Sequence, residues 1–263
     1  MKVDFHVHTS RSIDAVHTPR EMVKRAKAVG LEAIAITDHN RFFCRNEARR
    51  LTKEFGIIVI PGLEGGNIVV QKHWIALGIS RSVADFRHTI GNVLSIIHND
   101  GGTSVAPHPH ARLGFPDYAD LGFDAVESLN GREPHANEQV NNSGNIPEVG
   151  GSDAHAALML GFTWTEVDAI ETVEDILEAV RYGRCAPGGS VIPFLQYLRF
   201  YPIFIRHRIL LQPASAYRSV QRVIRDIRRV RNFEQQRTAV EHQGLQGDQI
   251  SSISIAARPL DWH

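Results

Sequence analysis

Short apolar runs alternate with amphipathic stretches through the first 190 residues of this 263-residue chain. Two of the apolar runs, Ala33–Ile36 and residues 57–60, are continuous, which is typical of strands covered on both faces. Helix-forming stretches separate such runs along the chain. An alternation of this kind predicts an α/β fold in which helices pack outside a parallel sheet.

The predicted elements follow this alternation. We expect strands over residues 3–7, Ala33–Ile36, 57–60, 68–70, Trp74–Leu77, 104–106 and 125–129. We expect helices over residues 19–29, 45–54, 83–98 and 172–182. Thr18 can cap the first of these helices, and Pro19 suits its first position, where no backbone N–H is required.

Histidine, aspartate and glutamate recur beside the ends of these strands. The positions are His6 and His8, Asp38 and His39, Glu64, His73, and His108 and His110; Asp153 and His155 follow a later turn. A barrel gathers the ends of its strands around one mouth. The placement of these polar residues therefore favours a barrel over an open sheet.

The spacing of His6 and His8 is the first indication of a metal site. Side chains alternate along a strand, so the two imidazoles share one face with Cα atoms roughly 6.6 Å apart. Two imidazoles at that separation can converge on one ion. Two half-buried histidines on a strand would explain this pair alone, but they would not explain the other clusters. Eleven of the 14 histidines also lie before residue 160.

The composition is that of a globular protein, with 43% hydrophobic and 22% charged residues. The two cysteines, Cys44 and Cys185, are too few for a disulfide framework and predict a reducing, cytoplasmic setting. The N-terminus has no signal-peptide pattern. The apolar stretch over residues 191–211 is interrupted by arginine and predicts no transmembrane span.

The run Pro187-Gly188-Gly189 predicts a boundary between a domain over residues 1–190 and a helical extension over 191–263. The first part carries 18 Lys and Arg against 24 Asp and Glu; the extension carries 11 arginines against five acids. An Arg-rich helix is expected over residues 215–233, followed by a flexible tail. This extension could pack on the barrel, form a homo-oligomer contact through residues 200–204, or attract a polyanion.

The polar clusters together resemble the PHP (polymerase and histidinol phosphatase) superfamily. The matching motifs are Asp4-Phe5-His6-Val7-His8-Thr9, Thr37-Asp38-His39-Asn40, Gly62-Leu63-Glu64, His73, Ala106-Pro107-His108-Pro109 and Gly151-Ser152-Asp153-Ala154-His155. They cover residues 1 to about 190. The resemblance implies a distorted (βα)7 barrel, related to the TIM barrel, that holds three metal ions.

The resemblance also implies three sets of ligands. His6, His8 and Asp153 would bind one ion; Glu64 would bridge it to a second ion bound by His73 and His108; and Asp14, His39 and His155 would bind the third. His17 competes with Asp14 for the last set. Mixed imidazole and carboxylate ligands suit Zn, Mn or Fe, and Mg is a further option.

The resemblance implies a metal-dependent phosphoesterase, and ions held by these ligands can activate a hydroxide. Glu64 would have the central role, Asp38 would orient a ligand, and His110 would contact phosphate or protonate the leaving group, as could Arg45 or Arg112. The substrate would be a phosphorylated small molecule, a nucleotide or an oligonucleotide. Hydrolysis of another bond, as in amidohydrolases, and a non-enzymatic nucleic-acid scaffold are the alternatives.

Four other side chains are given no role in the predicted site. His88 and His98 are expected on the surface of a helix, and His135 is expected in a loop. Cys44 lies near the second motif but lacks the histidine and aspartate spacing of an activated nucleophile.

Overall fold

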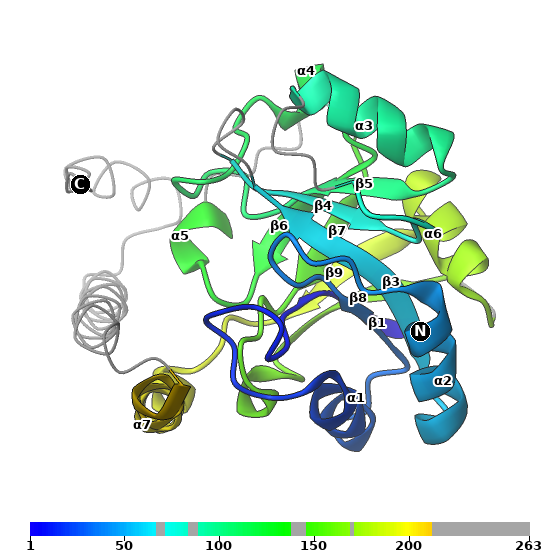
Figure 1. Cartoon of the computed structure of the whole chain (residues 1–263). Coiled ribbons are helices and arrows are strands. Elements are labelled where there is room, and N and C mark those ends of the chain that lie inside the picture. The colour runs from blue at the N-terminus through cyan, green and yellow to red at the C-terminus, as the bar shows by residue number, and fades with distance from the viewer. Residues whose placement is uncertain (67–71, 84–88, 138–145, 169–170, 212–263) are drawn as a thin grey trace, which may run out of the picture. The chain divides into compact units, whose positions relative to one another are not determined.

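The computed structural model describes residues 1–66, 72–83, 89–137, 146–168 and 171–211 (Figure 1). The chain divides into two compact units, Met1–Gln196 and Tyr197–His263, and each is described by itself.

The strands are β1 (Lys2–Val7), β2 (Ala33–Ile36), β3 (Ile58–Gly65), β4 (Trp74–Leu77), β5 (Thr103–Ala106), β6 (Ala125–Asn130), β7 (Glu148–Gly151), β8 (Thr163–Val167) and β9 (Cys185–Gly189). The helices are α1 (Pro19–Ala28), α2 (Arg45–Phe55), α3 (Ile90–Asn99), α4 (Tyr118–Leu121), α5 (Pro134–Asn137), the 3-10 turn η1 (Ala157–Met159), α6 (Val173–Arg181) and α7 (Phe194–Leu211).

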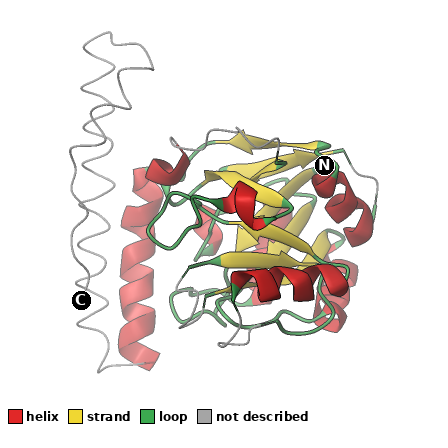
Figure 2. Ribbon diagram, turned by 90° about the horizontal axis from the view of Figure 1, so that it is seen from above, coloured by secondary structure: helices red, strands yellow, loops and turns green. Residues whose placement is uncertain are grey.

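Nine strands form one sheet in the order β7-β6-β5-β4-β3-β2-β1-β8-β9. The sheet curls so far that β7 approaches β8 and the end of β1. The Thr165 hydroxyl of β8 accepts a hydrogen bond from Gly150 N of β7 at 2.7 Å and donates to Gly150 O at 2.9 Å. His8 N donates to Ala154 O at 3.0 Å. The sheet is therefore a nearly closed barrel with helices outside it, as predicted (Figures 1 and 2).

Strand direction departs from the predicted parallel sheet. The pairs β1–β2, β2–β3, β5–β6 and β6–β7 are parallel, but β4 is antiparallel to both β3 and β5. Only residues 66–73 connect β3 to β4, whereas a parallel crossover needs a dozen residues or more. The reversal places the start of β4, and the preceding His73, at the same end of the barrel as the carboxyl ends of the parallel strands.

The third strand was expected to end at residue 60, before Pro61 and Gly62, yet β3 continues to Gly65. These two residues are instead where β3 changes partner, because Pro61 pairs with Ile36 of β2 and Gly62 with Leu77 of β4. A Cβ atom at residue 62 would lie 2.7 Å from Ala76 O, so the close approach of the strands requires glycine there.

Helix starts show which capping predictions hold. Thr18 accepts from Glu21 N and Glu21 bonds back to the Thr18 backbone, so α1 begins with a capping box as well as Pro19. Helix α3 begins at Ile90, later than predicted, because Thr89 caps it by accepting from Asn92 N. Residues 84–88 and the predicted strand at 68–70 lie outside the described part of the chain.

One buried apolar cluster takes members from every strand from β1 to β8 and from α6. Phe5, Ile60 and Leu177 are among them. Arg181 at the end of α6 donates to the Thr103 hydroxyl at the start of β5, at 2.8 Å. Helix α6 therefore covers the amino ends of the parallel strands, which leaves their carboxyl ends as the mouth of the barrel.

The described part of the second unit is the remainder of α7, in which Pro202 lies inside the helix. The ring of Phe200 is tilted against those of Tyr201 and Phe204, with ring centroids 5.4 and 5.5 Å apart. None of the helices in the described residues is long and apolar enough to cross a membrane. The predicted Arg-rich helix over residues 215–233 lies outside the described residues, and the packing of the extension on the barrel stays a prediction.

Candidate metal centre

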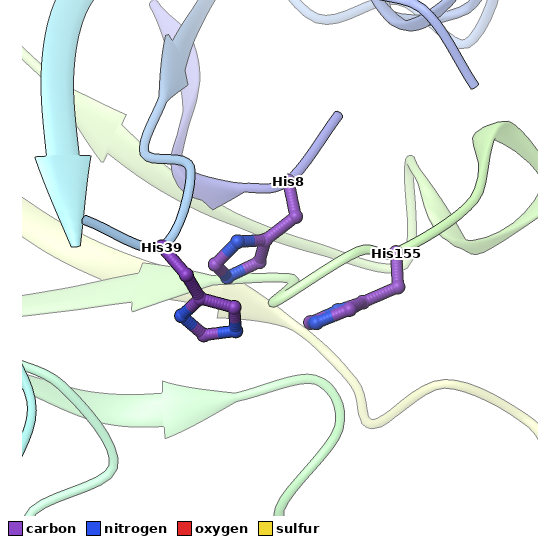
Figure 3. Close-up of side chains that lie close together, drawn as sticks. All are labelled: His8, His39 and His155. Atoms are coloured by element: carbon purple, nitrogen blue, oxygen red, sulfur yellow. The ribbon is translucent and has the colours of Figure 1, made fainter. Parts of the chain in front are cut away.

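All nine predicted ligands gather at the mouth of the barrel. They come from the ends of β1, β2, β3, β5 and β7, from the start of β4, and from the loop after β1. Figure 3 shows His8, His39 and His155 from three of these segments with their rings directed toward one another. The ring of His8 lies 4.3 Å from those of His39 and His155, measured between centroids.

Glu64 lies at the centre of the cluster. Its Oε1 atom is 2.7 Å from His73 Nδ1, 3.3 Å from His108 Nε2 and 3.6 Å from His6 Nε2. Its Oε2 atom is 2.6 Å from His39 Nδ1 and 3.4 Å from His8 Nε2. One carboxylate thus faces five imidazoles, which is the arrangement expected of a bridging ligand.

Two further carboxylates complete the cluster. Asp153 Oδ1 is 3.3 Å from His8 Nε2 and 3.7 Å from His6 Nε2. Asp14 Oδ2 is 3.4 Å from His155 Nε2 and 3.6 Å from His39 Nε2.

His17, the competitor of Asp14, is directed elsewhere, since its Nδ1 accepts a hydrogen bond from Ala157 N at 3.2 Å. The geometry therefore brings Asp14 to the cluster rather than His17.

The donor atoms fit a set of divalent cations better than they fit one another. The lone-pair nitrogens His6 Nε2 and His8 Nε2 are only 3.1 Å apart. Within the described residues, the buried oxygens Glu64 Oε2 and Asp14 Oδ1 accept no hydrogen bond. His39 Nδ1 lies close to Glu64 Oε2 but lacks hydrogen-bond geometry toward it. Unpaired buried acceptors are costly unless a cation or donor meets them.

Three overlapping groups in the cluster have donor atoms within 4.8 Å of one another: His8, His39 and His155; His6, His8 and Glu64; and His39, Glu64 and His73. These groups cross the three sets implied by the family resemblance, since His39 faces Glu64 as well as Asp14. The distances thus show a continuous cluster of donors, and the division into three sets stays a prediction.

The charges of the cluster reinforce one another. Burial raises the pKa of Glu64, but the imidazoles, with His73 and His39 foremost, outweigh it and hold that pKa well below its ordinary value. The pKa of Asp14 is likewise held well below its usual range, because His155 and His39 outweigh its burial. Burial, together with His155 and His39, lowers the pKa of His8, which keeps its imidazole neutral. Charged carboxylates and a neutral imidazole are the forms that bind metal. Although burial lowers the pKa of His6 and His39, the carboxylates around these two imidazoles hold it well above its ordinary value, so a bound cation would have to displace their protons.

Asp38 lies behind the cluster, and its role as an orienting residue stays a prediction that the following contacts support. It accepts hydrogen bonds from Thr9 N at 2.6 Å and from the Ser12 hydroxyl at 2.8 Å. Because Ser12 donates its proton to Asp38, its oxygen accepts from His8 Nδ1 at 3.1 Å and from His39 N at 3.0 Å. This chain places the proton of His8 on Nδ1 and leaves its Nε2 lone pair toward the cluster.

Two residues of the site were missed in the sequence. Glu127 in β6 is buried, and its Oε1 lies 3.0 Å from His6 Nδ1. Arg132, just after β6, has Nη1 3.0 Å from His155 Nε2 and 3.9 Å from Asp153 Oδ1. A glutamate within an apolar strand was the available signal for Glu127; no local pattern marked Arg132.

Two of the predicted ligands have strained backbones. His108 has φ 31° and Asp153 has φ 52°, a region that residues other than glycine rarely adopt. Asn40, beside His39, has φ 53°. Such strain persists where the surrounding structure holds it, and it concentrates at functional sites.

Other predicted residues lie outside the cluster. His110 packs edge-on against Tyr118, with ring centroids 6.4 Å apart, and burial lowers its pKa. Arg45 donates to the carbonyls of Gly78 and Ile79, and its contact with phosphate stays an untested suggestion. The loop that follows β4 holds its guanidinium.

Of the three histidines that were given no role in the predicted site, the structure describes the side chain of His98 alone. His98, on α3, lies 2.9 Å from Asp124 Oδ2 near the start of β5, away from the mouth. His88 and the side chain of His135 lie outside the described residues.

Parts of several known proteins are similar to this chain in sequence. An uncharacterized protein of Methanocaldococcus jannaschii is 33% identical over 156 residues, which is 54% of this chain and 88% of that protein. A 5'-3' exoribonuclease of Haemophilus influenzae is 37% identical over 78 residues, covering 30% of this chain and only 26% of that protein. A PolC-type DNA polymerase III of Caldanaerobacter subterraneus is 43% identical over 65 residues, or 24% of this chain and 5% of that protein.

Two crystal structures share the fold. One is a two-domain protein of Bacteroides vulgatus containing a predicted PHP-like metal-dependent phosphoesterase, with TM-score 0.60 and 23% identity over 72% of this chain and 65% of that one. The other is PsfC of Pseudomonas syringae, with TM-score 0.54 and 16% identity over 87% of this chain and 98% of that one. The family model described as the PHP domain matches residues 4–185. This match covers more than half of the chain and all nine residues of the cluster, and the chain therefore belongs to the PHP domain family.

Proposed function

We propose that this chain is a metal-dependent phosphoesterase that hydrolyses a phosphate ester at the mouth of its barrel. The observation that carries the proposal is Glu64, a buried carboxylate that faces five imidazoles drawn from four strands. A structural ion pair needs one such imidazole. A carboxylate that bridges two neighbouring ions accounts for four of the imidazoles, and the fifth, His39, would bind the adjacent third ion.

Three divalent ions fit the donor set. His6, His8 and Asp153 would hold one ion, His73 and His108 a second, and Asp14, His39 and His155 the third. Glu64 would bridge the first two. A mixture of imidazole and carboxylate suits Zn, Mn and Fe, whereas Mg prefers oxygen ligands.

Divalent ions in such a cluster lower the pKa of water and offset negative charge on a phosphoryl group. The protein's own residues prepare the site for both. The low pKa of Glu64 and Asp14 keeps these carboxylates charged at neutral pH. Asp38, acting through Ser12, holds the ring of His8 in one tautomer.

Arg132 is the residue we propose for contact with the substrate phosphate. Its side chain is 25% exposed, and its guanidinium lies beside His155 and Asp153 at the edge of the cluster. A planar guanidinium can donate two parallel hydrogen bonds to phosphate oxygens. Arg112, exposed in the loop after β5, and His110 remain further candidates for contact with phosphate or the leaving group.

The substrate we propose is a phosphorylated small molecule, a nucleotide or an oligonucleotide. The local similarity to the Haemophilus influenzae exoribonuclease favours the last two. Hydrolysis of another bond stays an alternative, since activated water can attack an amide as well. A scaffold role is less favoured, because all nine ligand positions carry competent side chains.

A substrate screen tests the proposal. Phosphomonoesters, nucleotides and short oligonucleotides would each be offered with Mn, Zn and Mg, beside a chelator-treated sample and the Glu64→Gln variant purified in parallel. We expect metal-dependent release of phosphate or nucleotide that both controls lack. Hydrolysis of amides but not of phosphate esters by the metal-loaded protein would contradict the proposed reaction.

A further inference from the structure

We propose that Glu127 is a positioning residue that holds His6 and His108 in place for metal binding. Strand β6 contributes none of the proposed ligands, yet this one buried carboxylate reaches ligands of two of the three proposed ions. Its role rests on the proposed metal site and is independent of the identity of the substrate.

Each oxygen of Glu127 has its own partners. Oε1 lies 3.0 Å from His6 Nδ1. Oε2 accepts from His108 N at 2.8 Å and from Asn130 Nδ2 at 2.8 Å. The residue is only 1% exposed, so these donors replace the water that a carboxylate would otherwise require.

The contact with His6 fixes which ring nitrogen carries the proton. A carboxylate only accepts hydrogen bonds, so His6 Nδ1 must donate to it. The lone pair of Nε2 then points away from Glu127, toward Asp153 Oδ1 at 3.7 Å and Glu64 Oε1 at 3.6 Å. A carboxylate in this place also makes the imidazole a better donor to a metal.

The contact with His108 restrains a strained backbone. His108 has φ 31°, and its N–H is held by Glu127 while its Nε2 lies 3.3 Å from Glu64 Oε1. Loss of the N–H partner would let this residue relax to an ordinary conformation, and its ring would turn from the cluster. Glu127 therefore supports one ligand through its ring and another through its main chain.

Gly151 gives a second and independent sign that the Glu127–His6 pair is built into the fold. A Cβ atom at residue 151 would lie 2.3 Å from Glu127 Oε1 and 2.5 Å from His6 Cβ. Any larger residue at the end of β7 would push the pair apart. The barrel thus leaves room for these two side chains at the point where β7 approaches β1.

Metal titration of Glu127→Gln tests this role. The variant keeps the size of the side chain but replaces one acceptor oxygen by a donor. In a competition titration with zinc, we expect the two ions assigned to His6 and His108 to bind about 10- to 100-fold more weakly, with the third ion changed about twofold or less. Excess zinc should restore binding. Glu166→Gln, the same change at an exposed position of β8, should bind zinc as the wild type does.

A measurement on the wild-type protein covers the case in which the variant fails to fold. Nitrogen-15 NMR of histidine-labelled, zinc-loaded protein should show His6 with a proton on Nδ1 and zinc at Nε2. An unprotonated Nδ1, or wild-type zinc affinity in folded Glu127→Gln, would overturn the role of Glu127 alone. Failure of the wild-type protein to bind zinc, manganese or iron would overturn the proposed function as well.

Discussion

The two ends of the barrel differ in what they bury. At the end covered by α6, the core consists of apolar side chains such as Phe5, Ile60 and Leu177. At the mouth, fully or nearly buried histidines and acids such as His6, His8 and Glu64 occupy the corresponding space. One strand can serve both ends, as β1 does with Phe5 and His6.

The difference separates stability from chemistry. Apolar burial stabilises the barrel by about 25 cal/mol for each Å² removed from water. Burying charge costs free energy unless each group is paired, and a buried ion pair is weak evidence of stability. We therefore expect the α6 end to maintain the fold and the mouth to depend on bound cations for its charge balance.

The largest expected effect is at the mouth. Glu64→Gln should reduce phosphoesterase turnover by at least ~10²-fold, because the bridging charge between two ions is lost. Steady-state assays at saturating metal would measure it. His98→Ala, near the opposite end of the barrel, is the matched control and should keep wild-type turnover. Undiminished turnover of Glu64→Gln with full metal content would refute the bridge.

The next effect is at the α6 end. Leu177 is buried and packs closely against Gly78, which has φ 68°. A Cβ atom placed on that glycine would lie only 2.3 Å from Leu177 Cδ1. Leu177→Ala should lower the free energy of unfolding by about 2–5 kcal/mol, through lost burial and the cavity left behind. Urea denaturation would measure this loss. If the metal affinity of folded Leu177→Ala fell as well, the mouth would depend on the α6 end, which would contradict the division of the barrel into a stabilising end and a metal-binding end.

A smaller effect is expected at the rim of the mouth. Arg132→Ala should raise KM by roughly 10- to 100-fold, because a charge-assisted hydrogen bond to the substrate is worth about 1.5–3 kcal/mol. Metal content should be unchanged. Arg184→Ala removes an exposed arginine near α6 and should leave KM as it is. A fall in metal content without a change in KM would place Arg132 among the supports of the cluster.

The existence of the strands from β1 to β6 and the polar residues beside their ends were predictable from the sequence, but β7, β8, β9 and the order of strands in the sheet were not predicted. Continuous apolar runs such as Ala33–Ile36 indicated covered strands, and the spacing of His6 and His8 indicated converging imidazoles, whose Nε2 atoms lie 3.1 Å apart. These features are local, because they depend only on the periodicity of residues within one strand. The same periodicity could not give strand direction, so the reversal of β4 went unpredicted.

The residues that position the proposed ligands were less predictable from the sequence than the ligands themselves. Glu127 functions through contacts with residues 121 and 19 positions away, His6 and His108, and nothing adjacent to it in the chain marks them. Strand β9, with the sequence Cys-Ala-Pro-Gly-Gly, has little β-propensity and forms because β8 pairs with it. Tertiary contacts decide such positions, and only the folded chain displays them.

Metal content tests the central claim most directly. Protein purified without chelator, then reconstituted with zinc or manganese and freed of excess ions, would be analysed for bound metal per chain. The nine proposed ligands, Glu64 and the five imidazoles that face it among them, predict a content approaching three ions per chain. Glu64→Gln should bind fewer ions under the same conditions, and His98→Ala should bind as many as the wild type. A wild-type content below one ion per chain after reconstitution would contradict the proposed metal centre.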